Sequence, residues 1–210
     1  INFANGGTVY GQIYYNNNAP YDMSILGQYS TGSLILGTNN TERMRIDSSG
    51  NVGIGVIPEA WTGYAPVLQI GDRGALAHYV DDSLTISDNW YYDGTNKRID
   101  TGFAARIQII SATGDMHFQN APTGAADSAI TFTTRLFIQD DGNVGIGTTS
   151  PQTRLAIGSA QGSGIDFLYD ANNTYKHQIK NYWNSSPDSR MDFNIGRTAN
   201  VAPVTVMSVG

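Results

Sequence analysis

The sequence predicts an all-β fold: an extended modular structure of repeated strand-turn-strand units with β-rich inserts between them. Runs with the period of an amphipathic helix, about 3.6 residues, are almost absent. The 24 glycines and 12 tyrosines stand among many Asn, Ser and Thr residues, a composition that suits turns and half-buried strands. One phrase also occurs twice, as SSGNVGIG at 48–55 and as DDGNVGIG at 140–147. Since a short repeated unit rarely closes its own core, its neighbours decide the architecture.

Composition argues against several classes of function. The 210 residues carry a net charge of −6, and only 14% of them are charged, so no phosphate-neutralising surface and no nucleic-acid partner are expected. The chain has no cysteine for disulfides or thiolate metal sites. It has no run of about 18 apolar residues, so membrane insertion is not expected. GNVGIG lacks the spacing and the following Lys of a phosphate loop, so no cofactor is expected.

Residues 1–41 are expected to form a β-rich module, the end of a preceding unit. Gly6-Gly7 predicts a turn between two β-like runs. Short strands are expected at 24–26 and 33–37, and a polar loop at 38–41 follows the second of them.

The first repeat unit spans residues 42–71. Apolar residues alternate with charged ones over 42–46, which predicts a strand with one buried face. The segment 47–51 is typical of a turn that needs glycine at positive φ. Val52 and Ile54 are expected to continue the buried face beyond this turn.

The second repeat unit spans residues 134–158 and repeats these features. A proline follows each copy of the phrase, Pro58 and Pro151, and a short strand that ends in glycine comes next. Equivalent positions of the two copies are expected to build a core shared between chains. These positions are Met44, Ile46, Gly50, Asn51, Val52, Gly53, Ile54 and Gly55 in the first copy, and Leu136, Ile138, Gly142, Asn143, Val144, Gly145, Ile146 and Gly147 in the second.

The glycines inside the repeated strand predict close packing. A strand glycine loses entropy and side-chain contacts, so Gly53 and Gly145 indicate close approach by another backbone, which we expect to belong to a second chain. Two full units are also too few for a solenoid, which needs about three. Lateral association of identical chains would supply the missing partners and cover the strand edges.

The rest of the chain is expected to form inserts and a further unit. Residues 72–133 and 159–206 predict β-rich inserts, and 207–210 predict the start of another repeat, truncated after its first strand. The chain is therefore expected to be a segment of a longer protein.

The repeated segments resemble the shafts of bacteriophage tail fibres and related receptor-binding proteins. The first copy, Thr41–Gly55, is followed by Val56–Pro58, where it departs from the sequence motif of that family. The second copy, continued through Gly147–Pro151, is closer to the motif. The resemblance covers the two copies, and the inserts match only in style. It implies an intertwined parallel homotrimer in which three chains wrap one axis and share strands. It also implies an extracellular place in the virion, as part of a tail fibre beside other tail or baseplate proteins.

Aromatic residues in the inserts are the candidate receptor contacts. Flat rings beside Asn, Asp and Ser suit a host surface glycan, although core or interface packing is the alternative for such rings. The candidates are Trp90, Tyr91, Tyr92, Tyr182 and Trp183. His117 is a weak candidate for an ion on a trimer axis. No catalytic residue is expected, because the acidic pair Asp140-Asp141 lies in the repeated turn and no nucleophile motif occurs.

The predicted function is that of a virion structural protein, a trimeric tail-fibre shaft segment that contributes to attachment to the host-cell surface. One alternative is a bacterial cell-surface adhesin or filament built on the same repeat. A second alternative is a tailspike that degrades polysaccharide, which would need a pair of carboxylates at a suitable separation.

Overall fold

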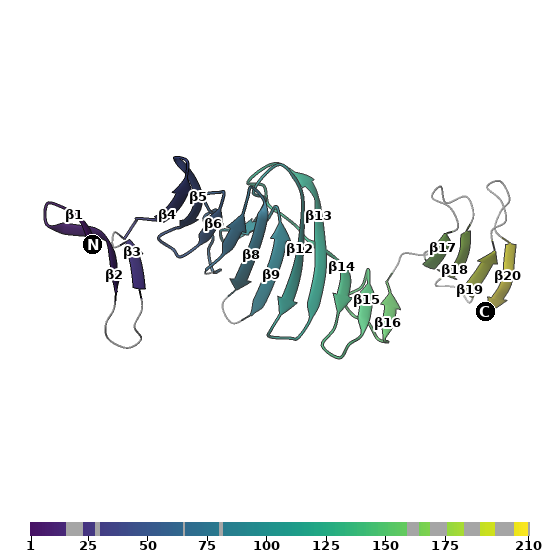
Figure 1. Cartoon of the computed structure of the whole chain (residues 1–210). Helices are drawn as coiled ribbons and strands as arrows, with labels where there is room; N and C mark the ends of the chain where they lie inside the picture. Colours follow the sequence, from purple (N-terminus) through teal and green to yellow (C-terminus); the bar gives the residue numbers. More distant parts are fainter. Residues whose placement is uncertain are drawn as a thin grey trace. The chain divides into compact units, whose positions relative to one another are not determined.

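A computed structural model describes residues 1–15, 23–27, 30–64, 66–79, 82–158, 164–168, 176–182, 190–195 and 204–209. The predicted all-β class is confirmed, because the described residues form several β-sheets and no helix (Figure 1). The chain divides into two compact units, Ile1–Asp141 and Gly142–Gly210. This division falls inside the predicted second repeat unit, at the turn before its glycine-bearing strand.

The strands of the first unit are β1 (Asn2–Asn5), β2 (Thr8–Tyr15), β3 (Met23–Gly27), β4 (Leu34–Thr38), β5 (Thr41–Ile46), β6 (Val52–Ile54), β7 (Leu68–Ile70), β8 (Gly74–Tyr79), β9 (Ser83–Asp88), β10 (Tyr91–Tyr92), β11 (Asn96–Lys97), β12 (Gly102–Ile110), β13 (Met116–Gly124) and β14 (Thr133–Ile138). Those of the second unit are β15 (Val144–Ile146), β16 (Leu155–Ile157), β17 (Gly164–Leu168), β18 (Lys176–Tyr182), β19 (Arg190–Ile195) and β20 (Val204–Val209).

The main sheet of the first unit has the strand order β14-β13-β12-β9-β8-β7-β6-β5-β4. Neighbouring strands in it are antiparallel, except that β6 and β7 are parallel. β1, β2 and β3 form a separate antiparallel sheet, and β10 pairs only with β11. The strands of the predicted insert 72–133 thus continue the sheet of the first repeat unit.

Residues with positive φ close the tight turns. Gly6 and Gly7 have φ of 58° and 83° in the β1–β2 hairpin, and Asn39 and Asn40 have φ of 53° in the β4–β5 hairpin. Two-residue hairpins need left-handed backbone at both positions, which glycine and asparagine adopt most readily. The expected turn at Gly6-Gly7 is therefore confirmed. The loop expected at 38–41 is shorter than predicted, a two-residue turn at Asn39-Asn40, because Thr38 and Thr41 pair as strand residues.

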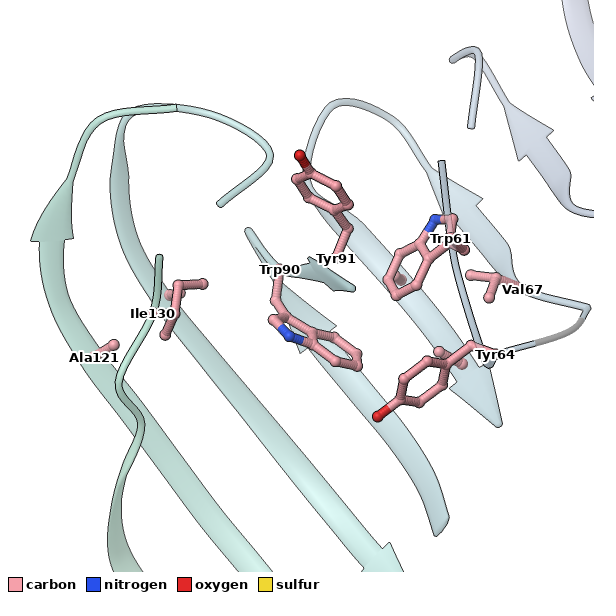
Figure 2. Packing of buried hydrophobic residues seen from close by; sticks show 10 residues of the cluster. Trp61, Tyr64, Val67, Trp90, Tyr91, Ala121 and Ile130 are labelled. Atoms are coloured by element: carbon pink, nitrogen blue, oxygen red, sulfur yellow. The ribbon is translucent and has the colours of Figure 1, made fainter. Parts of the chain in front are cut away.

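The hydrophobic core lies on one face of the main sheet. Trp61 and Tyr64 come from the connection between β6 and β7, and Trp90 comes from the segment before β10 (Figure 2). The ring of Trp90 is 5.3 Å from each of the other two rings, in edge-to-face geometry. Small residues such as Ala75 and Ala104 lie beneath them on the strands, which leaves room for the rings against the sheet.

A buried arginine holds the margin of this core. Arg98 is only 4% exposed, and its guanidinium donates hydrogen bonds to the carbonyl oxygens of Gly102, Pro122 and Ala129 at 2.6–3.1 Å. These bonds connect the ends of β12 and β13 with the segment that leads to β14. Such charge-assisted bonds compensate the cost of burying the cation.

In the second unit, β15 and β16 pair in parallel, as β6 and β7 do in the first unit. The antiparallel sheet of this unit has the strand order β17-β18-β19-β20. Its strand β19 matches the alternating segment at 191–196 in the predicted insert 159–206.

Candidate functional site

The two copies of the repeated phrase adopt the same local structure. Val52 N donates to the carbonyl oxygen of Val67 at 2.8 Å, and Val144 N donates to that of Arg154 at 2.9 Å. The glycine that ends each parallel partner strand donates back to the isoleucine of the phrase, at 2.9 and 2.8 Å. The phrase therefore encodes one structural unit, a short strand and a turn that returns the chain in parallel.

The polar residues of the first copy fix its turn. Asp47 Oδ1 accepts hydrogen bonds from the amides of Ser49 and Asn51, each at 2.8 Å, and Gly50 has a φ of 86°. Asn51 is buried, donates from Nδ2 to Asp47 Oδ2 at 3.0 Å, and accepts from Val67 N at 3.2 Å. The asparagine of the phrase thus links the turn to the start of β7.

Gly53 and Gly145 are closely approached by backbone, but by backbone of their own chain. A Cβ at Gly53 would overlap the carbonyl oxygen of Val56 and lie 2.8 Å from Pro58 Cδ. A Cβ at Gly145 would overlap the carbonyl oxygen of Thr148. The expectation of a close backbone is confirmed, whereas the expectation that a second chain provides it is wrong, because the following turn already fills that space.

The face of the main sheet that lies opposite the aromatic core carries an unbroken row of apolar side chains. Each member lies directly opposite the next on the neighbouring strand. The row consists of Leu34, Ile46, Val52, Leu68, Leu76, Ile86, Ile107, Phe118 and Leu136. We call this side of the sheet the open face, and the side that carries the aromatic core the covered face.

The open face is exposed in the single chain. Ile86 is 52% exposed at its centre, and Ile70 is 53% exposed beside the row. The parallel pair of the second unit repeats the pattern, since Ile146 pairs with Ile157 and Ile146 is 45% exposed. Isolated exposed apolar residues are ordinary, but a contiguous apolar surface marks a contact site.

The predicted core positions of the repeat therefore separate onto two faces. Met44, Ile46, Val52 and Ile54 lie on the open face, as their register across β5 and β6 requires. The predicted alternation is correct, but the side buried within the chain is that of Gly53. The apolar residues are left half-buried or exposed, so the expectation of a core shared between chains stays a prediction.

Two of the candidate glycan contacts are core residues. Trp90 has no exposed surface and Tyr91 is almost fully buried, with its hydroxyl donating to Asp127 Oδ1 at 2.8 Å. Neither ring can contact a receptor, so for these two the glycan interpretation is wrong and core packing explains them. Tyr182 ends β18, and Trp183 lies outside the described residues.

Tyr92 is the described candidate that does reach a pocket. A pocket of about 200 Å³ opens on the covered face. Its lining combines tyrosine rings with polar and charged side chains. It is formed mainly by Tyr64, Tyr79, Asp82, Tyr92, Asn96 and Arg106, and we call it the outer pocket. The sequence gives little sign of it, because β8, β9, β11 and β12 contribute from positions far apart in the chain.

His117 also lies on the covered face, paired across the sheet with Gln108 and Phe137. Its ring is 4.8 Å from that of Phe137, and its Nδ1 is 3.4 Å from Thr134 Oγ1. Burial lowers the pKa of His117. In the part of the chain that the structure describes, no group of three or more acidic, His or Cys side chains is placed to hold a metal ion.

No protein-family model and no curated protein matches this chain. None of the described residues belongs to a helix that is long and apolar enough to cross a lipid bilayer.

Proposed function

We propose that this chain is a segment of a homotrimeric tail-fibre shaft, a virion structural protein that contributes to attachment to the host-cell surface. The observation that carries the proposal is the open face, an apolar row that crosses the main sheet and is left half-buried or exposed in the single chain. The resemblance of the repeated phrase to tail-fibre shafts supplies the class of protein.

The open face favours association because the chain cannot bury it alone. Complete burial of one Leu or Ile side chain contributes about 1.5–3 kcal/mol, and the row spans every strand of the main sheet. The aromatic core already occupies the covered face, so within the main sheet the open face is the apolar side without a cover. Identical chains that turn this side toward a common axis bury it while the covered face stays outside.

The proposed mechanism is mechanical and multivalent. A stiff β-structured shaft holds binding sites away from the particle, and three equivalent sites on one fibre engage a surface together. Linked sites raise the apparent affinity without any new contact, because the second and third binding events become intramolecular.

Sedimentation equilibrium tests the trimer directly. Three chains of 22.6 kDa give about 68 kDa, which is the mass expected at micromolar concentration. Ile86→Asp places a carboxylate at the centre of the open face and should shift the protein to the monomer. Ile146→Asp makes the same change in the second copy of the phrase and should also weaken assembly.

Ile57→Asp is the matched control. Ile57 is 65% exposed, but it lies in the turn that packs against Gly53 on the covered side. The same substitution there should leave the trimer mass unchanged. A monomeric parent protein, or equal loss of assembly in the control and in Ile86→Asp, would overturn the proposal.

A further inference from the structure

The guanidinium of Arg106 lies in the outer pocket without an ion-pair partner, although Asp82 lines the same pocket. Arg45, Arg73 and Lys97 each form an ion pair, with Glu42, Asp100 and Asp93 respectively. Arg106 instead donates from Nε to Gln119 Oε1 at 2.6 Å and from Nη1 to Asn96 Oδ1 at 3.4 Å. Both partners are neutral amides, so among the described residues no carboxylate forms a direct ion pair with Arg106.

The surroundings of Arg106 hold it in place, and the side chain stays charged at neutral pH despite its burial. Its Cζ lies 4.1 Å from the ring centre of Phe132 and 5.2 Å from that of Trp90. Burial lowers the pKa of Arg106 to about 10, so the side chain remains protonated at neutral pH. A desolvated cation fixed between rings and amides is prepared for an anion, because the fork of an arginine matches a carboxylate.

The other walls of the outer pocket suit a sugar ring. The rings of Tyr64 and Tyr79 lie 5.0 Å apart, and those of Tyr64 and Tyr92 lie 5.6 Å apart, so three tyrosines form one aromatic wall. Asp82 adds an acceptor for hydroxyl groups, and Asn96, whose Oδ1 accepts from Trp90 Nε1 at 2.8 Å, adds the donor of its amide group. Convergent polar groups beside aromatic surface are the usual composition of a small-ligand site.

We propose that the outer pocket binds a carboxylate-bearing sugar residue of the uronic acid type, with the carboxylate on Arg106, the ring against the tyrosines, and hydroxyl groups on Asp82 and Asn96. The volume of about 200 Å³ fits one sugar residue of a longer polysaccharide. A separate free anion would gain nothing from the tyrosine wall and would face the carboxylate of Asp82.

The position of the pocket agrees with this role. Tyr79, Arg106 and the other strand residues of its lining project from the covered face, opposite the open face. In the proposed trimer the pocket would therefore face outward, once on each chain. As a receptor site it rests on the proposed function, but its chemistry can be tested on the protein in any oligomeric state.

Calorimetric titration of the full chain with methyl glucuronide, methyl glucoside and acetate tests the proposal. The first two probes differ only in the carboxylate, and the third is a carboxylate without a sugar. We expect methyl glucuronide to bind about tenfold or more tightly than either of the others, since only this probe combines a charge-assisted hydrogen bond to Arg106 with a sugar ring against the tyrosines. Equal binding of glucuronide and glucoside, or of glucuronide and acetate, would overturn it, as would no binding.

Two variants locate the binding on the protein. Arg106→Gln should remove the preference for glucuronide over glucoside. Tyr79→Ala, at a rim position that is 39% exposed, should weaken both sugars without a change in the fold. Unchanged binding in Tyr79→Ala would place the site elsewhere. A trimer that binds no glucuronide would refute only the proposed sugar site in the outer pocket. A monomer that binds glucuronide would refute only the proposed trimeric shaft.

Discussion

The carbonyl oxygen of Thr148 lies so close to Gly145 that the Cβ of any side chain there would overlap it. The carbonyl oxygen of Val56 stands in the same relation to Gly53 in the first copy. The glycine thus lets the turn after the strand fold back against it, and this turn leads the chain toward the strand that pairs with it in parallel. The requirement is local, and it is met within one chain.

Gly145→Ala should therefore destabilise the protein. The methyl group must displace backbone, and overpacking of this kind costs about 1–3 kcal/mol, more than the fraction of a kcal/mol that alanine gains by restricting the unfolded chain. Urea denaturation measures the change. Gly27→Ala is the control, because no atom lies within 4 Å of its Cβ position and its φ is not positive. An equal effect at both glycines would show that the contact with Thr148 is not tight.

Much of the repeat could be predicted from sequence because its determinants are close together in the chain. The alternation at 42–46, the turn at 47–51 and the need for glycine at positive φ are local rules, and Gly50 and Gly142 have φ of 86° and 85°. The existence of strands in 72–133 was equally accessible. Their arrangement in one sheet was not, because β9 pairs with β12, and the strands β10 and β11 lie between these two in the sequence.

The candidate site was harder to predict for a related reason. The aromatic run at 90–92 is a good signal for a glycan contact only if its rings reach solvent. In the structure Trp90 faces the core and Tyr92 reaches the outer pocket. The side that each ring takes is set by Trp61 and Tyr64, which come from an extended connection in the first copy. The sequence did not single out Arg106, because the absence of an ion-pair partner can be seen only in the folded chain.

Asn51→Ala should destabilise the first repeat unit by about 1–3 kcal/mol. It leaves the buried amide of Val67 without its acceptor and removes the bond to Asp47 Oδ2. Thermal unfolding measures the loss. Asn2→Ala is the control, because Asn2 also accepts a side-chain hydrogen bond, from Gln12 at 3.0 Å, but does so at an exposed site. The interpretation fails if the two variants melt at the same temperature.

Arg98→Met should cost on the order of 3 kcal/mol. The methionine has similar length but leaves the carbonyl oxygens of Gly102, Pro122 and Ala129 without their donor. Chemical denaturation should show the loss as a lower midpoint. Arg43→Met gives the comparison, since Arg43 is exposed and donates only to Thr38 Oγ1 at 3.1 Å. A midpoint for Arg98→Met as high as that of Arg43→Met would mean that other donors or water replace the guanidinium.

Glu59→Gln should stabilise the protein in a pH-dependent way. Burial raises the pKa of Glu59, and the carboxylate of Asp127 raises it further. A raised carboxyl pKa means that the folded state loses stability as pH rises from the usual pKa of glutamate, about 4, through the raised value. Glutamine never ionises, so the variant should match the parent near pH 3 and exceed it at pH 7.

Glu42→Gln supplies the opposite sign in the same experiment. The hydrogen bond from Arg45 lowers the pKa of Glu42, so its charged form stabilises the folded state above the usual pKa and this contribution disappears as pH falls. This variant should be less stable than the parent at pH 7, and equal to it at a pH low enough to protonate Glu42 in the parent. Melting curves between pH 3 and pH 7 should therefore diverge in opposite directions for the two variants. Parallel curves for Glu59→Gln and the parent would show that Glu59 is as well solvated in the folded chain as in the unfolded one.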